Sequence, residues 1–500
     1  MKRWQKAKQE NTANPPIIFS EDLIKGLFEK NSDVQFETFH FGRSPSFKVL
    51  FTYCEGMVNT EGLSHFATHR LNEFFIDKDL EDVTEDTISK NLFLPSIKWI
   101  NDKDQLISDI FTGRVAIFIE GYPFLFSIDL IKRPQRQPEE TNMEMSVKGP
   151  RDNLIEDISI NMALIRKRLP TNSLCSEKLV IGKRSRTNVC VVYIKDVANP
   201  TILQALIKKL KAIDIEGIIN GTQLMELVFP KSLLFPYHDY SARPDYIVRS
   251  LLSGRIVILI DGIPYSIITP VNLFLLLKSA EDFEYAFLYN SLERLMRITG
   301  LLVAGFLPAF WVALTLFHQD QIPLPLLATI IESRKGVPMP AFLEAIIMLV
   351  LFELFREAGL RLPAAIGQTL SVVGGLIIGD AAISAGITSP SMLVVVAASS
   401  VATFTLVNQS LIGTITIIRV GVLIFSSFFG FFGFFLSLFL IVLMVANIRI
   451  FGVPYMELAT KISISNILKA TFRLPASLYK TRPPMFDSKD KTRMGDDDQS

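Results

Sequence analysis

The 500-residue chain is poor in cysteine and has no excess of charge of either sign. Its three cysteines, Cys54, Cys175 and Cys190, are too few and too far apart for a disulfide framework or a cysteine-rich zinc site. Its 51 basic and 50 acidic residues provide no clustered positive charge of the kind that binds nucleic acid. These shortages favour a reducing, cytoplasmic side for the cysteines and argue against nucleic acid as a partner.

The chain also lacks the motifs on which common enzyme classes depend. It contains no Walker loop, no Gly-x-Gly-x-x-Gly and no Gly-x-Ser-x-Gly elbow, so we do not expect an enzyme of these classes. His65 and His69 have the i, i+4 spacing of a metal pair but lack the intervening Glu of a metalloprotease. We therefore expect no catalytic residues, no metal and no cofactor. The N-terminus has no apolar core of a secretory signal, so the first 300 residues should stay where they are made.

Charged residues are scarce in one long part of the chain. Residues 301–450 contain 12 charged side chains, whereas the other 350 residues contain 89 of the 101. Hydrophobic residues make up 49% of the chain, which disfavours an ordinary soluble protein. We therefore predict an α/β soluble N-terminal region followed by an all-α polytopic membrane domain.

The soluble part contains an internal duplication. The β-rich runs 48–54 and 188–194 align at an offset of 140, and segments 106–123 and 247–264 match at 6 of 18 positions. In each copy, a helix that ends at a glycine leads into two strands joined by an acidic-Gly turn. We predict a first α/β subdomain over residues 1–145, and a connecting helix with a second α/β subdomain over residues 146–290.

Two charge patterns in this part have structural explanations. Arg114 and Arg255 follow the capping glycines, and a helix cap leading into a hairpin explains them better than a phosphate site does. Residues 146–169 place acidic side chains early and Arg-Lys-Arg late, which complements the dipole of the connecting helix. We expect the duplicated region to assemble subunits and to transmit a conformational change.

The membrane domain, residues 291–450, contains about six hydrophobic segments and is expected to make four to six spans. The segments are 300–317, 341–355, 364–387, 391–407 and the two halves of the 38-residue run 411–448. That run is too long for one span, so we expect a hairpin near Ser426, Ser427 and the FFGFFGFF repeat. Glu344 suits the first turn of its helix and Glu353 an interfacial position, so neither is expected to bind an ion.

The distribution of basic residues predicts the orientation of the chain in the membrane. Arg294 and Arg297 precede the first span, and basic residues predominate between 449 and 482, before the charged tail. By the positive-inside rule, both termini should be cytoplasmic. Residues 451–500 are expected to form a basic cytoplasmic segment and a disordered tail.

Segment 364–387 carries small and polar residues on one helical face. They are Gln368, Ser371, Gly375, Gly379, Ala382 and Gly386. The stripe fits close helix packing through Gly375 and Gly379, or a pore lining that a neighbouring apolar residue such as Val372 closes. From the pattern alone, packing is favoured. Asp380 lies away from the stripe and is a candidate for an ion pathway.

Four segments, in order, resemble the A subunits of the GerA-type germinant receptors of endospore-forming bacteria. They are residues 148–168, 243–264, 337–390 and the FGVPY at 451–455. The chain departs from the family pattern at Lys148, Asp380 and Val407, where Arg, Gln and Pro are usual. A related A-like protein encoded with the spore dipicolinate-channel genes is the alternative, and the run 359–368 favours the receptor subunit.

The resemblance implies a multi-pass protein of the inner spore membrane. Its partners would be a permease-like B subunit that binds the nutrient, a lipoprotein C subunit, the lipid bilayer and further copies of itself in a ring. The ring would release monovalent cations when a germinant is sensed, with a pore lined by Gln368, Ser371, Val372, Gly375, Gly379 and Ala382. The alternative is a non-conducting scaffold that relays germinant binding to another channel.

Overall fold

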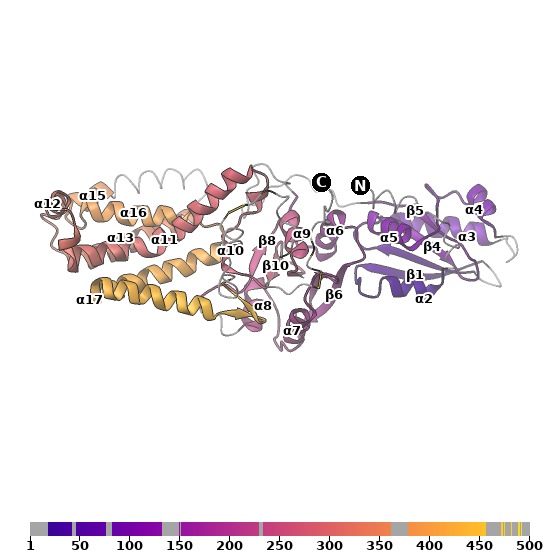
Figure 1. The fold of residues 1–500 in the computed structure, drawn as a ribbon. Helices are drawn as coiled ribbons and strands as arrows, with labels where there is room; N and C mark the ends of the chain where they lie inside the picture. Colours follow the sequence, from indigo (N-terminus) through magenta and orange to yellow (C-terminus); the bar gives the residue numbers. More distant parts are fainter. Residues whose placement is uncertain are drawn as a thin grey trace, which may run out of the picture. The chain divides into compact units, whose positions relative to one another are not determined.

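The structure, a computed structural model, describes residues 19–42, 47–76, 83–132, 150, 152–229, 234–361 and 379–456, and a few single residues after 470. The chain forms two compact units (Figure 1). Unit 1 comprises Met1–Phe229, Tyr240–Pro270 and Lys480–Ser500. Unit 2 comprises Pro230–Asp239 and Val271–Tyr479.

Unit 1 contains two five-stranded sheets with the same strand order. The first sheet has the order β1-β2-β4-β5-β3 and the second the order β6-β7-β9-β10-β8. The strands of the first are β1 (Val34–Phe41), β2 (Phe47–Cys54), β3 (Lys98–Ile100), β4 (Arg114–Ile119) and β5 (Leu125–Asp129). Those of the second are β6 (Leu174–Ile181), β7 (Thr187–Ile194), β8 (Asp239–Ser241), β9 (Ile256–Ile260) and β10 (Ser266–Thr269). The predicted duplication is therefore present in the fold as well as in the sequence.

The first sheet is buried on both faces because successive side chains of its central strands enter two different cores. On β2, Val49 and Phe51 enter one core, whereas Leu50 and Cys54 enter the other. The π-helix Gly62–Ala67, α3 (Thr68–Ile76) and α4 (Glu85–Asn91) contribute to the first of these cores. The second core includes α2 (Glu21–Leu27) and α5 (Lys103–Thr112), so the subdomain is a layered α/β structure.

The second subdomain repeats the helix-to-strand joint of the first. Its helices are α6 (Ile158–Arg168), α7 (Pro200–Lys211), α8 (Gly221–Val228) and α9 (Pro244–Leu252). After α5 and α9, Gly113 and Gly254 adopt left-handed φ angles of 95° and 94°, which glycine tolerates without steric cost. The Arg114 side chain then donates from Nε to Ser127 Oγ at 2.9 Å. Arg114 therefore links β4 to β5, in agreement with the structural interpretation of the Gly-Arg pair.

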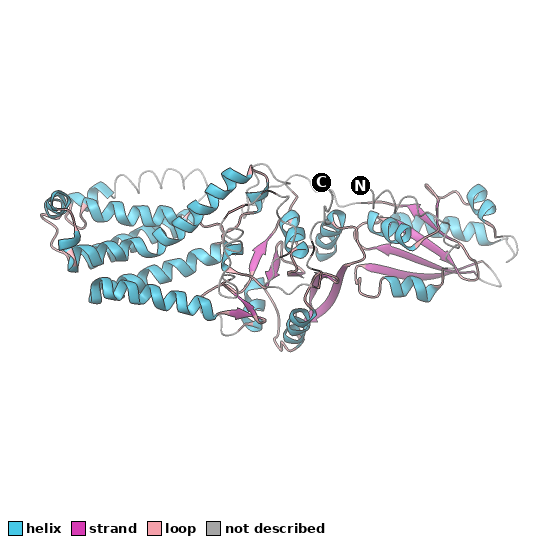
Figure 2. Ribbon diagram, in the orientation of Figure 1, coloured by secondary structure: helices cyan, strands magenta, loops and turns pink. Residues whose placement is uncertain are grey.

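Unit 2 is mainly helical (Figure 2). Its longer helices are α11 (Phe287–Phe317), α12 (Leu324–Ser333), α13 (Ala341–Arg361), α16 (Pro390–Thr403) and α17 (Gln409–Asn447). Its shorter elements are α10 (Leu273–Leu276), the 3-10 turns Ala280–Phe283 and Gln319–Gln321, α15 (Gly379–Ser384), β11 (Arg449–Ile450) and β12 (Val453–Pro454). Helix α11 packs against α16 and α17, and α13 packs against α16. The predicted fold class, an α/β region followed by a helical domain, is confirmed.

Within the described residues, two helices are long and apolar enough to cross a membrane, α11 and α17. Helix α11 begins at Phe287, well before the predicted first span at residue 300, and at 31 residues it is about 46 Å long. Helix α12 lies between the predicted hydrophobic segments 300–317 and 341–355. Its ten residues are too few to cross a bilayer core about 30 Å thick.

Helix α17 is divided into two arms at Gly430, where φ is 60° and ψ is −139°. A Cβ built on Gly433 would collide with the main-chain carbonyl of Phe425, which shows that the chain turns back at this point. Figure 1 shows the two arms side by side. The reversal thus lies within the FFGFFGFF repeat, as predicted. At 1.5 Å per residue, arms 409–429 and 431–447 are about 31 and 25 Å long, close to the thickness of a bilayer core.

Candidate functional site

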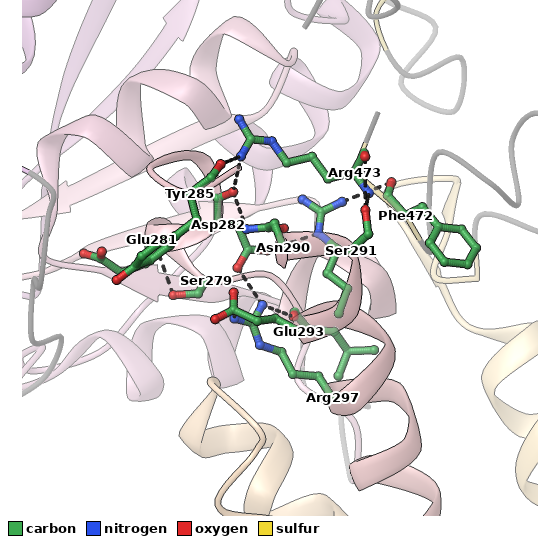
Figure 3. Close-up of polar contacts among 12 residues, drawn as sticks. Ser279, Glu281, Asp282, Tyr285, Asn290, Ser291, Glu293, Arg297, Phe472 and Arg473 are labelled. Atoms are coloured by element: carbon green, nitrogen blue, oxygen red, sulfur yellow. Dashed lines mark hydrogen bonds and ion pairs between the residues drawn. The ribbon is translucent and has the colours of Figure 1, made fainter. Parts of the chain in front are cut away.

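A buried carboxylate in the turn just before α11 organises a polar cluster of unit 2 (Figure 3). Asp282 has no exposed surface. Its Oδ2 lies 3.2 Å from Nε of Arg294, and its Oδ1 accepts from Nη1 of Arg297 at 2.6 Å. Both arginines lie on the buried side of the first turns of α11, three residues apart, which places them on one helical face. The carboxylate therefore fixes the first turns of α11 to the preceding 3-10 turn.

The same cluster holds a segment near the C-terminus. Arg473 donates from Nη1 to the carbonyl oxygen of Asp282 at 2.9 Å and also to that of Tyr285. The backbone of Arg473 exchanges hydrogen bonds of 3.1 Å with Ser291 Oγ. Asn290 donates to the carbonyl of Asp282 as well (Figure 3). The cluster therefore joins α11 and the turn that precedes it to a segment that is distant in sequence, near the C-terminus.

The geometry of this cluster changes the interpretation of Arg294 and Arg297. The sequence analysis treats the two arginines as positive charges that flank the first span and indicate its orientation. In the structure both side chains point inward to Asp282, whereas the apolar side chains of Leu288, Leu292 and Met296 are exposed. A helix with its charges inside and its apolar side chains outside is typical of contact with lipid or with an apolar partner rather than with water.

A second buried carboxylate, Glu344, connects the start of α13 to the start of α16. Its Oε1 accepts from Nη2 of Arg334 at 3.0 Å. Its Oε2 accepts from the backbone N–H and the hydroxyl of Ser389 at 3.0 and 2.9 Å. Ser389 is the N-cap of α16, so the charge of Glu344 stabilises that helix end through its amide. Glu344 lies in the first turn of its helix, as expected, and its partners give it a structural role that the pattern did not predict.

The only charge in the hydrophobic run 411–448 is Arg419, and its side chain is buried within the bundle. Its Nη2 lies 3.8 Å from Oε2 of Glu353, and its Nη1 donates to Ser399 Oγ at 3.3 Å. Glu353 also pairs with Arg356. A buried charge is costly unless it is paired, and these contacts link α17 to α13 and α16.

Most of the predicted pore-lining residues lie outside the part of the chain that the structure describes. These are Gln368, Ser371, Val372 and Gly375. Gly379 and Ala382 lie on the buried side of α15, whereas Asp380 is exposed. The helix that we expected to reach Ile387 ends at Ser384, because Gly386 turns the chain with a left-handed φ of 67°. The stripe therefore continues for one turn of α15, and its role as a pore lining stays a prediction.

Unit 1 contains a buried ion pair that the sequence analysis missed. Arg166, which we assigned to the basic end of the connecting helix, has no exposed surface and binds Asp33 through two hydrogen bonds of 3.0 and 2.9 Å. Its Nη1 donates to the carbonyls of Thr171 and Leu174. The guanidinium also lies 4.0 Å from the ring centroid of Phe111. Helix α6 thus joins the first subdomain to the second through a charge that the helix dipole alone does not explain.

The three cysteines are free and buried in unit 1. Burial raises the pKa of Cys190 to about 12 and raises the pKa of Cys54 and Cys175 above the ordinary value for a thiol. Protonated, buried thiols are poor nucleophiles and poor metal ligands. Among the described residues, no group of three His, Cys, Asp or Glu side chains could hold a metal ion.

The fold consists of a duplicated α/β region and a helical region with two helices long and apolar enough to cross a membrane. Within the described part of the helical region, the buried charges of Asp282, Glu344 and Arg419 are paired. The GerA family, described as Bacillus/Clostridium GerA spore germination protein, matches residues 22–485. The chain belongs to this family, the A subunits of GerA-type germinant receptors.

Two relatives cover almost the whole chain. The chain is 41% identical to spore germination protein XA of Bacillus anthracis over 95% of its own length and 97% of that protein. It is 30% identical to spore germination protein KA of Bacillus subtilis (strain 168), over 96% of its length and 90% of that protein. The solved N-terminal domain of the A subunit of the Bacillus megaterium germinant receptor GerK3 matches half of the chain and 92% of that domain, with 25% identity and a TM-score of 0.39. The chain is therefore similar to spore germination proteins over nearly its full length.

Proposed function

We propose that this protein is the ion-conducting A subunit of a germinant receptor. In the proposal, copies of the chain form a ring in the inner spore membrane, with both termini cytoplasmic. A permease-like B subunit binds the nutrient, and a lipoprotein C subunit completes the receptor. Binding of a germinant opens the ring to monovalent cations.

The observation that carries this proposal is the stripe of small and polar residues over 364–387 in a chain of the GerA family. A path for a hydrated ion needs small or polar groups along one helical face, together with an apolar ring that closes it by dewetting. Gln368, Ser371, Gly375 and Gly379 provide such a face, and Val372 provides the ring. Asp380, which is exposed, provides a negative charge that favours cations near one end of this segment.

The second candidate is a non-conducting scaffold that relays germinant binding to another channel. The observation in its favour is the number of structural polar links in unit 2. Asp282, Glu344 and Arg419 each connect separate segments, and a protein that only transmits motion needs such links. The two functions differ in whether the stripe contacts water and ions or only other helices.

Substitution of Val372 separates the two functions. In a pore, Val372→Ala widens an apolar ring once per subunit and favours wetting, so spores should lose dormancy or germinate without nutrient. In a packed helix, the same change removes two methyl groups from a contact, destabilises the receptor by about 1 kcal/mol and slows germination. Dormancy, nutrient response and receptor amount should be measured in the same spores.

A second substitution serves as the matched test. Gly375→Val adds bulk to the same face, so it should block cation release while leaving the amount of receptor measurable. A Val372→Ala strain with normal protein level and normal dormancy, together with a Gly375→Val strain that still releases cations, would exclude this segment from the pore.

A further inference from the structure

Helix α11 contains a proline, Pro308, in its buried middle section. Proline has no amide hydrogen, so the carbonyl of the residue four positions earlier loses its regular helical donor. That residue is Ala304, which is fully buried and cannot obtain a replacement donor from bulk water. An unsatisfied carbonyl in an apolar bundle is costly, so another group has to replace the missing donor.

The replacement donor is a side chain of another helix. Ser399 of α16 donates its hydroxyl hydrogen to the carbonyl oxygen of Ala304 at 2.9 Å. Ser399 has no exposed surface, so this bond is shielded from water. The close approach depends on small residues, because Gly300, one turn earlier on α11, leaves no room for a Cβ against Thr405. This hydrogen bond links α11 directly to α16 at the position where α11 lacks its own backbone donor.

The hydroxyl of Ser399 is in turn held by a charge. Having given its hydrogen to Ala304, the Ser399 oxygen has lone pairs free to accept, and it accepts from Nη1 of Arg419 on α17 at 3.3 Å. The other Nη of Arg419 lies 3.8 Å from Glu353 on α13. Four helices therefore meet in one chain of polar contacts, from the Ala304 carbonyl through Ser399 and Arg419 to Glu353.

We propose that Ser399 is a positioning residue that supplies the donor missing at the Pro308 break, and that Arg419, paired with Glu353, orients its hydroxyl. The contacts among Ala304, Ser399, Arg419 and Glu353, which we call the joint, then couple movement of α11 to α13, α16 and α17. Its use in opening a channel rests on the proposed function, but the joint itself does not. It would serve equally in a scaffold that relays a signal.

A double-mutant cycle between Pro308 and Ser399 tests the joint. Ser399→Ala and Pro308→Ala are made singly and together in the full-length protein, and thermal unfolding is followed in detergent. Ser399→Ala alone should lower the melting temperature, because Ala304 loses its donor. In the Pro308→Ala background, residue 308 regains an amide hydrogen for Ala304, so the shift caused by Ser399→Ala should fall to less than roughly half. An equal shift in both backgrounds would contradict the proposal.

Two further variants distinguish a missing donor from a packing defect. Ser399→Thr keeps the hydroxyl and should retain a melting temperature closer to that of the unsubstituted protein than Ser399→Ala does. Ser437→Ala is the control, because the buried Ser437 hydroxyl bonds to a carbonyl, that of Gly433, whose regular helical donor is still present. Its effect should be the same with Pro308 and with Ala at 308. A Ser399→Thr variant no better than Ser399→Ala would overturn the assignment of a donor role.

The contribution of Arg419 is tested in the same assay. If Arg419 orients the Ser399 hydroxyl, then Ser399→Ala and Arg419→Gln should be less than additive, since each disrupts the same chain of contacts. Additive shifts would remove Arg419 from the joint. Both outcomes are independent of conduction, so they leave the test of the channel function separate.

Discussion

Arg166 and Asp33 show how a fully buried charge is stabilised in this chain. Each side chain is at most 5% exposed, and every polar contact between them is at 3.0 Å or less. Ser176 gives the same carboxylate a further bond of 2.9 Å. The low dielectric strengthens these bonds, and it also makes the loss of one partner expensive, because the other charge stays buried and unpaired.

Removal of one partner should therefore destabilise unit 1 strongly. We expect Arg166→Met to lower the free energy of unfolding by about 3 to 5 kcal/mol. The double substitution Arg166→Met with Asp33→Leu should lose less than the single one, since it leaves no unpaired charge. The matched control is Asp214→Asn, which breaks the exposed pair with Lys183 and should cost less than about 1 kcal/mol. Chemical unfolding of the full-length protein measures all three, and equal losses for the buried and exposed pairs would refute this explanation.

The buried cysteines predict a reactivity and a pH dependence. Because burial raises the pKa of Cys190 to about 12, the native thiol stays protonated near pH 8 and should react slowly with iodoacetamide. In denaturant, all three thiols should react rapidly. The folded state also holds its thiol protons above pH 9, where the unfolded state releases them, so stability should fall as pH rises from about 9 to about 12. Rapid modification of the native protein at pH 8 would contradict the buried positions.

At the scale of elements, the hairpin of α17 depends on glycines, and Gly430 sets the backbone conformation of its turn. Gly430 has φ 60° and ψ −139°, a conformation that other residues adopt only with strain, and a Cβ there would lie 3.0 Å from Phe317. Gly430→Ala should cost about 1 to 3 kcal/mol and reduce the amount of folded protein. Gly421→Ala is the control, since a Cβ at that helical position meets nothing within 4 Å. Equal melting temperatures for the two variants would argue against the turn at Gly430.

The elements that could be predicted from the sequence are those that depend on local patterns. Runs rich in β-forming residues predicted the β2 and β7 strands, and Gly113 and Gly254 marked the helix ends, because local conformational preferences decide both. The 38-residue apolar run predicted the hairpin, because no single span is so long. These features need no knowledge of distant contacts.

The polar links of the site could not be predicted, because their partners lie far apart in the sequence. Asp33 and Arg166 are 133 residues apart, and Ala304 and Ser399 are 95 apart. One signal was present: a proline inside a helix always leaves a carbonyl four residues earlier without its donor, so Pro308 marked Ala304 as a group in need of a partner. The partner, Ser399, can be identified only from the three-dimensional structure.

At the scale of the whole molecule, the orientation in the membrane is the first prediction. Basic residues flank the predicted membrane domain, so both termini should be cytoplasmic. Single cysteines introduced at the exposed Lys30 and Lys489 should resist an impermeant reagent in intact cells and react after permeabilisation. The native cysteines are buried and give little background. Labelling of either position in intact cells would reverse the predicted topology.

The channel function is tested most directly by electrical recording of the purified full-length protein in a planar bilayer. Discrete current steps carried by monovalent cations are expected, with more frequent opening for Val372→Ala than for the unsubstituted protein. Gly375→Val should reduce the step size. If correctly inserted protein, including the Val372→Ala variant, produces no steps, the conducting function is wrong and the scaffold function replaces it.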